Sequence, residues 1–588
     1  MSKYFNNAII GNSKILGCLT DKGELIRLYY PYIDYFQNID QYKFAILKDS
    51  NVLWFDCANL KRQYYEGNIV YTELEKDGYE ILQRDYILPK KNILVRTLKF
   101  NKKLDLLLYS KLNSDVNKKV SGMVVSNALI QYCQEMYMTT VANQEISKYQ
   151  INNSSNALLN GDFNQEDYIG MSEDAAILYS GVKEITLYIS FENNLKDTLK
   201  TVEWCKKQEE NLLYESTKKY WNDYLKIFEN NLVFNNITKI KEKEIINRTI
   251  LLFALYMNPD TGATLATANV DEKFEKSGGY GYCWPRDAIF INKALNILGL
   301  KKYTDKFYSV WAPKAQLKSG LFEQRYFSNG ELAPSWGLQI DETAAILIGI
   351  YENKKYKELE TLIVKSITGL LNFIDEEYIS KECFDLWEER RGKHLYSTAS
   401  IYESLRCGRT MLEEINEEKY SKIIKEINKT LTNMKSAILD KFVEGSYLKR
   451  STDNSNTDIS VLGLVIPYHV FEANDKLIEN TVKKFETDLK TPNGGYMRYQ
   501  WDSYMGGNAW IISSLWLALY YIELNNITKA RELFDWVTNH SDSMGFLAEQ
   551  LDRETGAVKW VQQLSWSHAM YVIVKAQLVK YEKNQSNM

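Results

Sequence analysis

The sequence contains few of the residues that usually bind metals or form disulfides. Its four histidines are far apart, and no pair has the three- or four-residue spacing of a metal-binding helix. Its seven cysteines are scattered and form no CxxC pair, which argues against a zinc site and against a disulfide framework. We therefore expect no metal and no other cofactor.

The sequence also lacks an excess of charge of one sign and any long apolar run. Its 72 Lys and Arg residues and 76 Asp and Glu residues give a net charge of −4, without the basic excess that nucleic-acid binding usually needs. No stretch approaches the ~18 consecutive apolar residues of a membrane-spanning helix, and the N-terminal segment contains no apolar core of a signal peptide. We therefore expect a cytoplasmic protein that binds neither nucleic acid nor membranes.

The chain is long enough for several domains, and its pattern changes near residue 195. Up to that point short apolar runs alternate with polar residues, as in 93–100, 104–109 and 185–191, which is typical of strands. The pattern predicts an antiparallel β-sandwich over residues 1–195. Residues 196–239 are rich in charge and contain no Pro or Gly, which predicts a helical linker.

Helical periodicity dominates the rest of the chain, residues 240–588. Twelve segments show it: 240–258, 287–300, 302–317, 341–353, 355–375, 397–414, 417–441, 458–470, 472–488, 508–524, 526–539 and 566–582. Twelve helices joined by long loops predict a barrel of six helical hairpins with functional loops at one end. A solenoid of hairpins is the alternative, although no repeat of fixed period is visible.

Four segments between these helices concentrate glycine, aromatic and charged residues. They are GGYGYCWPRD at 278–287, DLWEERR at 385–391, GGYMRYQWDSYMGGNAW at 494–510, and FLAEQLD at 546–552 with LSWSHA at 564–569. Each alone has an ordinary interpretation: Arg286 and Asp287 as a charge pair at a helix start, Glu388 and Glu389 as a solvated face, Glu549 as a helix cap. Only their combination indicates a binding site.

Together with SWGLQIDETA and the longer strings GYCWPRDAIF, DLWEERRGKHLYSTA and LAEQLDRETG, these motifs resemble the glucoamylase family, glycoside hydrolase family 15. They occur in the order of that family, and the N-terminal half resembles its bacterial and archaeal branch. The resemblance implies an α+β multidomain fold, with an N-terminal antiparallel β-sandwich (supersandwich), a linker helix and an (α/α)6 catalytic barrel over 240–588.

The resemblance also implies roles for individual residues. Glu388 falls on the general acid of the family and Glu549 on its general base. Arg286 and Asp287 match the pair that grips the non-reducing glucose. The other substrate-binding positions that we expect are Trp284, Asp385, Trp387, Glu389, Arg498, Trp510 and Trp566.

The expected function is that of an inverting, exo-acting glucoamylase. Such an enzyme releases β-glucose from the non-reducing ends of α-1,4-linked glucooligosaccharides, with some activity on α-1,6 links. It uses one protonated carboxyl and one carboxylate that activates water. The expected partner is an α-glucan or maltooligosaccharide substrate, and the oligomeric state stays open. Pro285 favours this reading modestly, whereas GATLATANVDEKF lacks a proline that many relatives have in the entry loop.

Three alternatives stay open. A trehalase or an isomaltose-cleaving α-glucosidase of the same family would use the same two acids. A sugar phosphorylase would use phosphate in place of a water-activating carboxylate, so Glu549 argues against it. A sugar-binding protein without catalysis would need neither acid.

Overall fold

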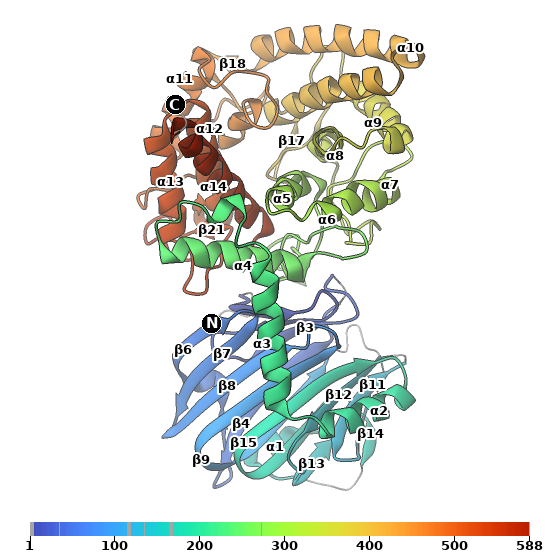
Figure 1. Cartoon of the computed structure of the whole chain (residues 1–588), viewed down its shortest axis with the longest axis vertical. Helices are drawn as coiled ribbons and strands as arrows, with labels where there is room; N and C mark the ends of the chain where they lie inside the picture. The colour runs from blue at the N-terminus through green and yellow to red at the C-terminus, as the bar shows by residue number, and fades with distance from the viewer. Residues whose placement is uncertain are drawn as a thin grey trace. The chain divides into compact units, whose positions relative to one another are not determined.

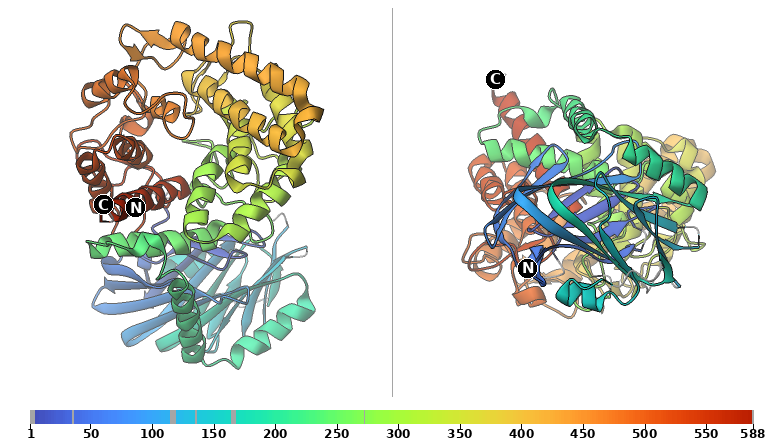
Figure 2. Two further views of the ribbon diagram at one scale, coloured as in Figure 1. Left: turned by 45° about the horizontal axis from the view of Figure 1, so that its top comes forward. Right: turned by 90° about the horizontal axis from the view of Figure 1, so that it is seen from below.

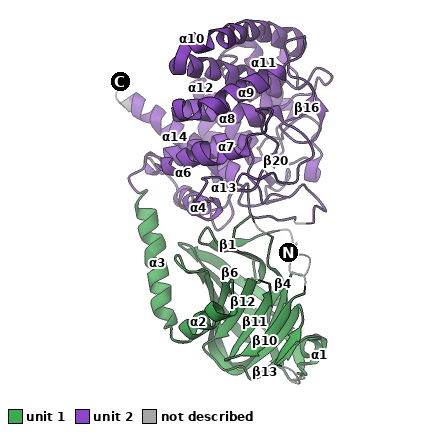
Figure 3. Cartoon of the chain, turned by 90° about the vertical axis from the view of Figure 1, so that its right-hand side faces the viewer, with its two compact units in different colours: residues 1–228 green, residues 229–588 purple. Residues whose placement is uncertain are grey.

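The computed structural model describes residues 5–34, 36–113, 119–134, 136–163, 168–271 and 273–586. The chain divides into two compact units, Met1–Phe228 and Glu229–Met588 (Figure 3). The division falls inside the range 196–239 that the sequence predicts as a helical linker. No helix among the described residues is both long enough and apolar enough to cross a membrane.

The first unit is built on an antiparallel sheet, as the sequence predicts (Figure 1). Ten of its strands run in the order β1-β2-β3-β4-β9-β15-β12-β11-β10-β14, and β5 to β8 and β13 pair beside this path. The strands are β1 Ala8–Gly11, β2 Leu16–Leu19, β3 Leu25–Tyr29, β4 Ile39–Lys48, β5 Asn51–Trp54, β6 Asn59–Glu66, β7 Ile69–Lys76, β8 Tyr79–Ile87, β9 Ile93–Leu112, β10 Ser121–Val125, β11 Ala128–Cys133, β12 Met136–Ala142, β13 Lys148–Ile151, β14 Ile169–Met171 and β15 Asp174–Glu192.

The two long strands β9 and β15 hold this sheet together. They pair with each other along almost their whole length, and the register shifts between Tyr179 and Val182 and again between Val182 and Glu184. Such bulges bend and twist a ladder. On one side of the bulge β9 pairs with β4, and on the other side it pairs with β8, so one strand serves two parts of the sheet.

The α-helices among the described residues of the first unit are α1 Ser155–Asn160, α2 Leu195–Lys206 and α3 Glu210–Lys226. Val202 and Cys205 of α2 and Tyr214 of α3 pack into the same apolar cluster as strand residues such as Ile69. Arg84 of β8 also forms an ion pair with Glu210 at 2.5 Å. The helices of the expected linker therefore cover the sheet instead of standing free.

The second unit is a helical barrel (Figure 2). Its helices are α4 Ile240–Tyr256, α5 Pro285–Ile297, α6 Lys301–Lys306, α7 Ala312–Ala315, α8 Ile340–Asn353, α9 Glu360–Asn372, α10 Leu395–Phe442, α11 Lys476–Asp488, α12 Ile511–Glu523, α13 Ile527–Asn539 and α14 Ser565–Ser586. Short strands connect its loops: β16 Cys383–Phe384, β17 Arg391–Gly392, β18 Val443–Glu444, β19 Tyr447–Leu448, β20 Ala509–Trp510 and β21 Gln550–Leu551.

An inner ring of six elements closes this barrel. Contacts run from α5 to α8, α10, the 3-10 helix η5 (Ile459–Leu464), α12, α14 and back to α5. Helix α10 is two helices in one, because Asn416 has non-helical backbone angles (φ −171°, ψ 92°). Its first half belongs to the inner ring. Its second half is followed in the chain by η5, which gives the six hairpins that the sequence predicts.

One expected helix is wrong. The segment 458–470 contains only η5, Ile459–Leu464. Pro467 has no N–H with which to continue a helix, and Tyr468 N donates to the Gly463 carbonyl instead. The remaining eleven segments each contain α-helix.

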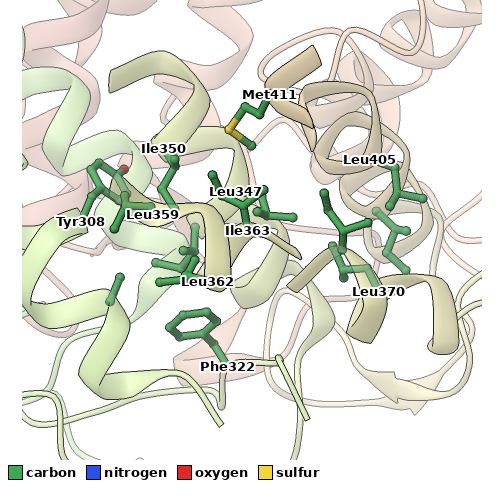
Figure 4. Packing of buried hydrophobic residues seen from close by; sticks show 14 of the residues in the cluster. Tyr308, Phe322, Leu347, Ile350, Leu359, Leu362, Ile363, Leu370, Leu405 and Met411 are labelled. Atoms are coloured by element: carbon green, nitrogen blue, oxygen red, sulfur yellow. The ribbon is translucent and has the colours of Figure 1, made fainter. Parts of the chain in front are cut away.

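The wall of the barrel is apolar on the side where α8, α9 and α10 meet (Figure 4). Leu347 and Ile350 of α8 pack with Ile363 of α9 and Met411 of α10, and all four are fully buried. Removing such side chains from water is the main free energy that favours folding. This wall holds the inner helices in place, so that the loops before their N-termini meet at one end.

Candidate active site

A pocket with an empty volume of about 830 Å³ lies at that end of the barrel. Its lining includes ten of the eleven predicted site residues: Trp284, Arg286, Asp287, Trp387, Glu388, Glu389, Arg498, Trp510, Glu549 and Trp566. The eleventh, Asp385, is buried and is not part of the lining. Most of these residues come from loops that end at the first turn of an inner helix, where the helix dipole favours negative charge.

Asp385 shapes the turn that carries Glu388. Its Oδ1 accepts hydrogen bonds from the backbone N–H groups of Glu389 at 2.9 Å and Arg390 at 3.2 Å. Its carbonyl accepts from Glu388 N at 3.0 Å, and Arg450 pairs with its other oxygen. Glu388 itself has a left-handed backbone (φ 65°), an uncommon conformation for a residue with a side chain. This turn aims the Glu388 side chain into the pocket.

Three donors surround the Glu388 carboxylate. Trp284 Nε1 donates to Oε1 at 2.7 Å and Gln324 Nε2 donates to Oε2 at 2.6 Å. Arg286 Nη2 lies 3.3 Å from Oε1. With 19% of its side chain exposed, Glu388 is not part of a solvated face. A single orientation is therefore fixed by groups from two segments, the start of α5 and the loop that carries Gln324.

Glu549 lies in the same pocket in a more buried position. Tyr280 Oη donates to Oε1 at 3.1 Å, and Gln550 Nε2 donates to Oε2 at 2.9 Å. Burial raises the pKa of Glu549 to about 7, and the nearby Glu388 charge acts in the same direction. The pairing of β20 with β21, Trp510 opposite Gln550, holds this segment against the loop before α12.

Residues 240–534 match the family model of the glycosyl hydrolases family 15. The chain belongs to this family. A glycosyl hydrolase of Methanocaldococcus jannaschii is 25% identical over 97% of this chain and 98% of its own length. Trehalase 2 of Sulfolobus acidocaldarius is 26% identical, and the alignment covers 48% of this chain and 53% of that enzyme.

A solved structure extends the likeness to both units. The crystal structure of a bacterial glucoamylase complexed with acarbose matches with a TM-score of 0.85 over 99% of this chain and 94% of that one, at 18% identity. The fold is therefore that of an N-terminal antiparallel sheet domain and a helical barrel, and the chain is a glycoside hydrolase.

Arg286 of this family 15 enzyme lies among four carboxyl groups. Its guanidinium is 3.4 Å from Asp287, 3.6 Å from Asp341, 3.2 Å from Glu342 and 3.3 Å from Glu388. Burial raises the pKa of Asp287 and of Asp341 to about 6 each, and that of Glu342 well above its usual range, although Arg286 opposes these shifts. The carboxyl groups of Asp287 on α5 and of Asp341 and Glu342 on α8 thus hold the Arg286 guanidinium in place.

Arg498 is the second cationic side chain that lines the pocket, after Arg286. It binds both oxygens of Asp502 at 2.8 Å, and its Nη2 reaches Glu389 at 2.9 Å. Its guanidinium also lies over the rings of Trp387 and Trp510, 5.4 Å and 4.7 Å from their centroids. Glu389 therefore positions Arg498 rather than projecting into solvent.

Several residues of the site have no role in the sequence interpretation. Tyr280 and Trp336 lie inside quoted motifs, but nothing in the spacing distinguishes them from structural aromatics. Gln324 lies outside every motif, and only the fold brings it to Glu388. Among the described residues, no group of three or more His, Cys, Asp or Glu side chains is arranged to hold a metal ion.

Proposed function

We propose that this family 15 enzyme is an inverting exo-glucosidase of the glucoamylase type, acting on α-1,4-linked glucooligosaccharides. The observation that carries the proposal is the pair of carboxyl groups in one pocket, in different environments. Glu388 is held by three donors at the wall, and Glu549 is deeper, with Tyr280 and Gln550 as partners. An inverting hydrolase needs two such groups on opposite sides of a sugar.

In this mechanism Glu388 donates a proton to the glycosidic oxygen as the bond breaks. Glu549 accepts a proton from a water molecule, which attacks the anomeric carbon from the other face of the ring. Tyr280 and Gln550 hold the Glu549 carboxylate in one orientation by donating to both of its oxygens. Arg286, Asp287 and Arg498 offer charged groups to the hydroxyls of the terminal glucose.

The aromatic walls fit a sugar for a further reason. Trp510 and Trp566 line the pocket with flat aromatic rings, and pockets that bind small organic molecules are lined mainly by apolar and aromatic side chains. Pro285, in the loop that carries Arg286, favours glucoamylase over trehalase.

A trehalase is the second candidate, favoured by the alignment with Trehalase 2. The test is incubation with maltose, maltotetraose, isomaltose and trehalose, each with and without phosphate. The proposal expects glucose from maltotetraose and maltose, independent of phosphate. Hydrolysis of trehalose or isomaltose alone would favour the other family activities, and glucose phosphate would indicate a phosphorylase.

A further inference from the structure

The loop before Tyr280 presents an exposed aromatic ring next to the pocket-lining Gly279. Phe274 is 48% exposed, although burial would be favourable for a ring of this size. Its backbone is left-handed, with φ of 54°, which is rare for a bulky residue. An exposed ring on an unfavourable backbone is a reason to look for a function.

The buried Asp271 imposes this conformation. Its carboxylate accepts from the backbone N–H groups of Glu275 at 3.0 Å, Lys276 at 2.8 Å and Ser277 at 2.6 Å, and its own carbonyl accepts from Phe274 N at 3.1 Å. Hydrogen bonds to a charged acceptor are strong. They offset the cost of the left-handed residue and fix the loop, whose end at Ser277 already lines the pocket.

Two adjacent glycines bring two rings to the backbone at this point. A Cβ atom on Gly278 would lie 2.2 Å from the Trp336 ring, and one on Gly279 would lie 3.1 Å from Phe274 Cε1. Both glycines line the pocket, as does Trp336, which is 42% exposed. Phe274 and Trp336 thus flank one short piece of the pocket wall, each with an open face.

We propose that Phe274 is a specificity-determining residue that stacks on the second leaving-group sugar of an oligosaccharide. This proposal rests on the proposed function, because the occupant is the part of the same substrate that extends out of the pocket. Trp336, on the other side of the two glycines, donates from Nε1 to the Glu388 carbonyl at 3.3 Å, which ties this piece of wall to the proposed acid. Under the proposal a disaccharide ends before the Phe274 ring, and a trisaccharide reaches it.

The test compares maltose with maltotriose. Phe274→Asn removes the ring while keeping a residue that tolerates the left-handed conformation, and Phe274→Tyr keeps the ring. We expect the ratio of kcat/KM for maltotriose to that for maltose to fall about five-fold in Phe274→Asn, the size of one aromatic contact, mainly through KM for maltotriose. Phe274→Tyr should retain the wild-type ratio.

Leu439→Asn on α10 is the matched control, since Leu439 is 47% exposed and belongs to no pocket loop. The inference would be overturned if the maltotriose-to-maltose ratio of kcat/KM were the same in Phe274→Asn as in this control. Equal losses of kcat/KM on both substrates would also overturn it, because they would indicate damage to the loop. If the wild-type enzyme releases glucose from neither sugar, the proposed function fails and the inference fails with it. If the wild-type enzyme is active and Phe274→Asn leaves this ratio unchanged, only the inference fails and the proposed function stands.

Discussion

At the scale of single residues, the two carboxyl groups differ in what surrounds them. Glu388 accepts from donors of two segments, whereas Glu549 is buried and accepts from Tyr280 and Gln550. Burial destabilises a carboxylate and raises its pKa, and donors oppose this shift at Glu549. The two side chains therefore lie in different surroundings, and each can be changed by one substitution.

Glu388→Gln is expected to lower kcat on maltotetraose by at least about 100-fold, because an amide keeps the shape of the side chain but has no proton to donate. Sugar binding should persist, measured by the change in tryptophan fluorescence on titration with maltotetraose. Glu382→Gln, just before β16, is the matched control, since Glu382 is exposed and its ion pair with Arg391 is long, at 3.7 Å. Near wild-type turnover in Glu388→Gln would exclude Glu388 as the acid.

The pH dependence of activity should report Glu549. A general base acts only when ionised, and the pKa of Glu549 is raised to about 7, chiefly by burial. As the pH falls through this value the base becomes protonated, so kcat/KM on maltotetraose should fall, approaching about ten-fold per pH unit below it. A profile that is flat between pH 7 and pH 5 would contradict this role.

Tyr280→Phe should move that limb of the profile to higher pH. The Tyr280 hydroxyl donates to the Glu549 carboxylate and so lowers its pKa against the larger effect of burial. Without this donor the ionised form loses a partner, and the pKa rises further. Tyr282→Phe provides the comparison, because the Tyr282 ring packs against Arg325; its profile should match that of the wild type.

At the scale of elements, periodicity predicts most of the helices because each buries one face against its neighbours. The sequence predicts the kinked α10 as two helices, 397–414 and 417–441, and the structure has non-helical backbone angles at Asn416, between them. The prediction of a helix over 458–470 is wrong because the run of apolar residues there resembles a buried helix, although Pro467 prevents one. Gln324 could not have been predicted as a partner of Glu388, because no local signal shows which loops the barrel brings together.

Leu347→Ala tests the apolar wall that supports these loops. Leu347 is fully buried between α8, α9 and α10, so a cavity should remain after truncation (Figure 4). We expect the free energy of unfolding to fall by about 2–5 kcal/mol, measured by urea denaturation. Leu439→Ala, at an exposed position, should change it by less than about 0.5 kcal/mol. Similar losses in both variants would mean that this wall does not limit stability.

At the scale of the whole molecule, the closed ring makes the chemistry possible. Glu388 and Glu549 are 549 − 388 = 161 residues apart in the sequence, and each lies before a different inner helix, α10 and α14. A ring places two such loops on opposite sides of one pocket, where an open row of hairpins would leave them apart. The fold thus sets where the two carboxyl groups stand, and their separation determines the course of the reaction.

The anomer of the first product follows from that separation. In an inverting enzyme the two carboxyl groups stand roughly 6.5–9.5 Å apart, which leaves room for a water molecule. In a retaining enzyme they stand roughly 5–5.5 Å apart, and one of them attacks the sugar directly. We expect β-glucose as the first product from maltotetraose, because Glu549 would activate a water on the face opposite Glu388. Proton NMR in the first minutes, before the anomers interconvert, distinguishes the two. α-Glucose first would mean that Glu549 is a nucleophile or that another residue is the acid.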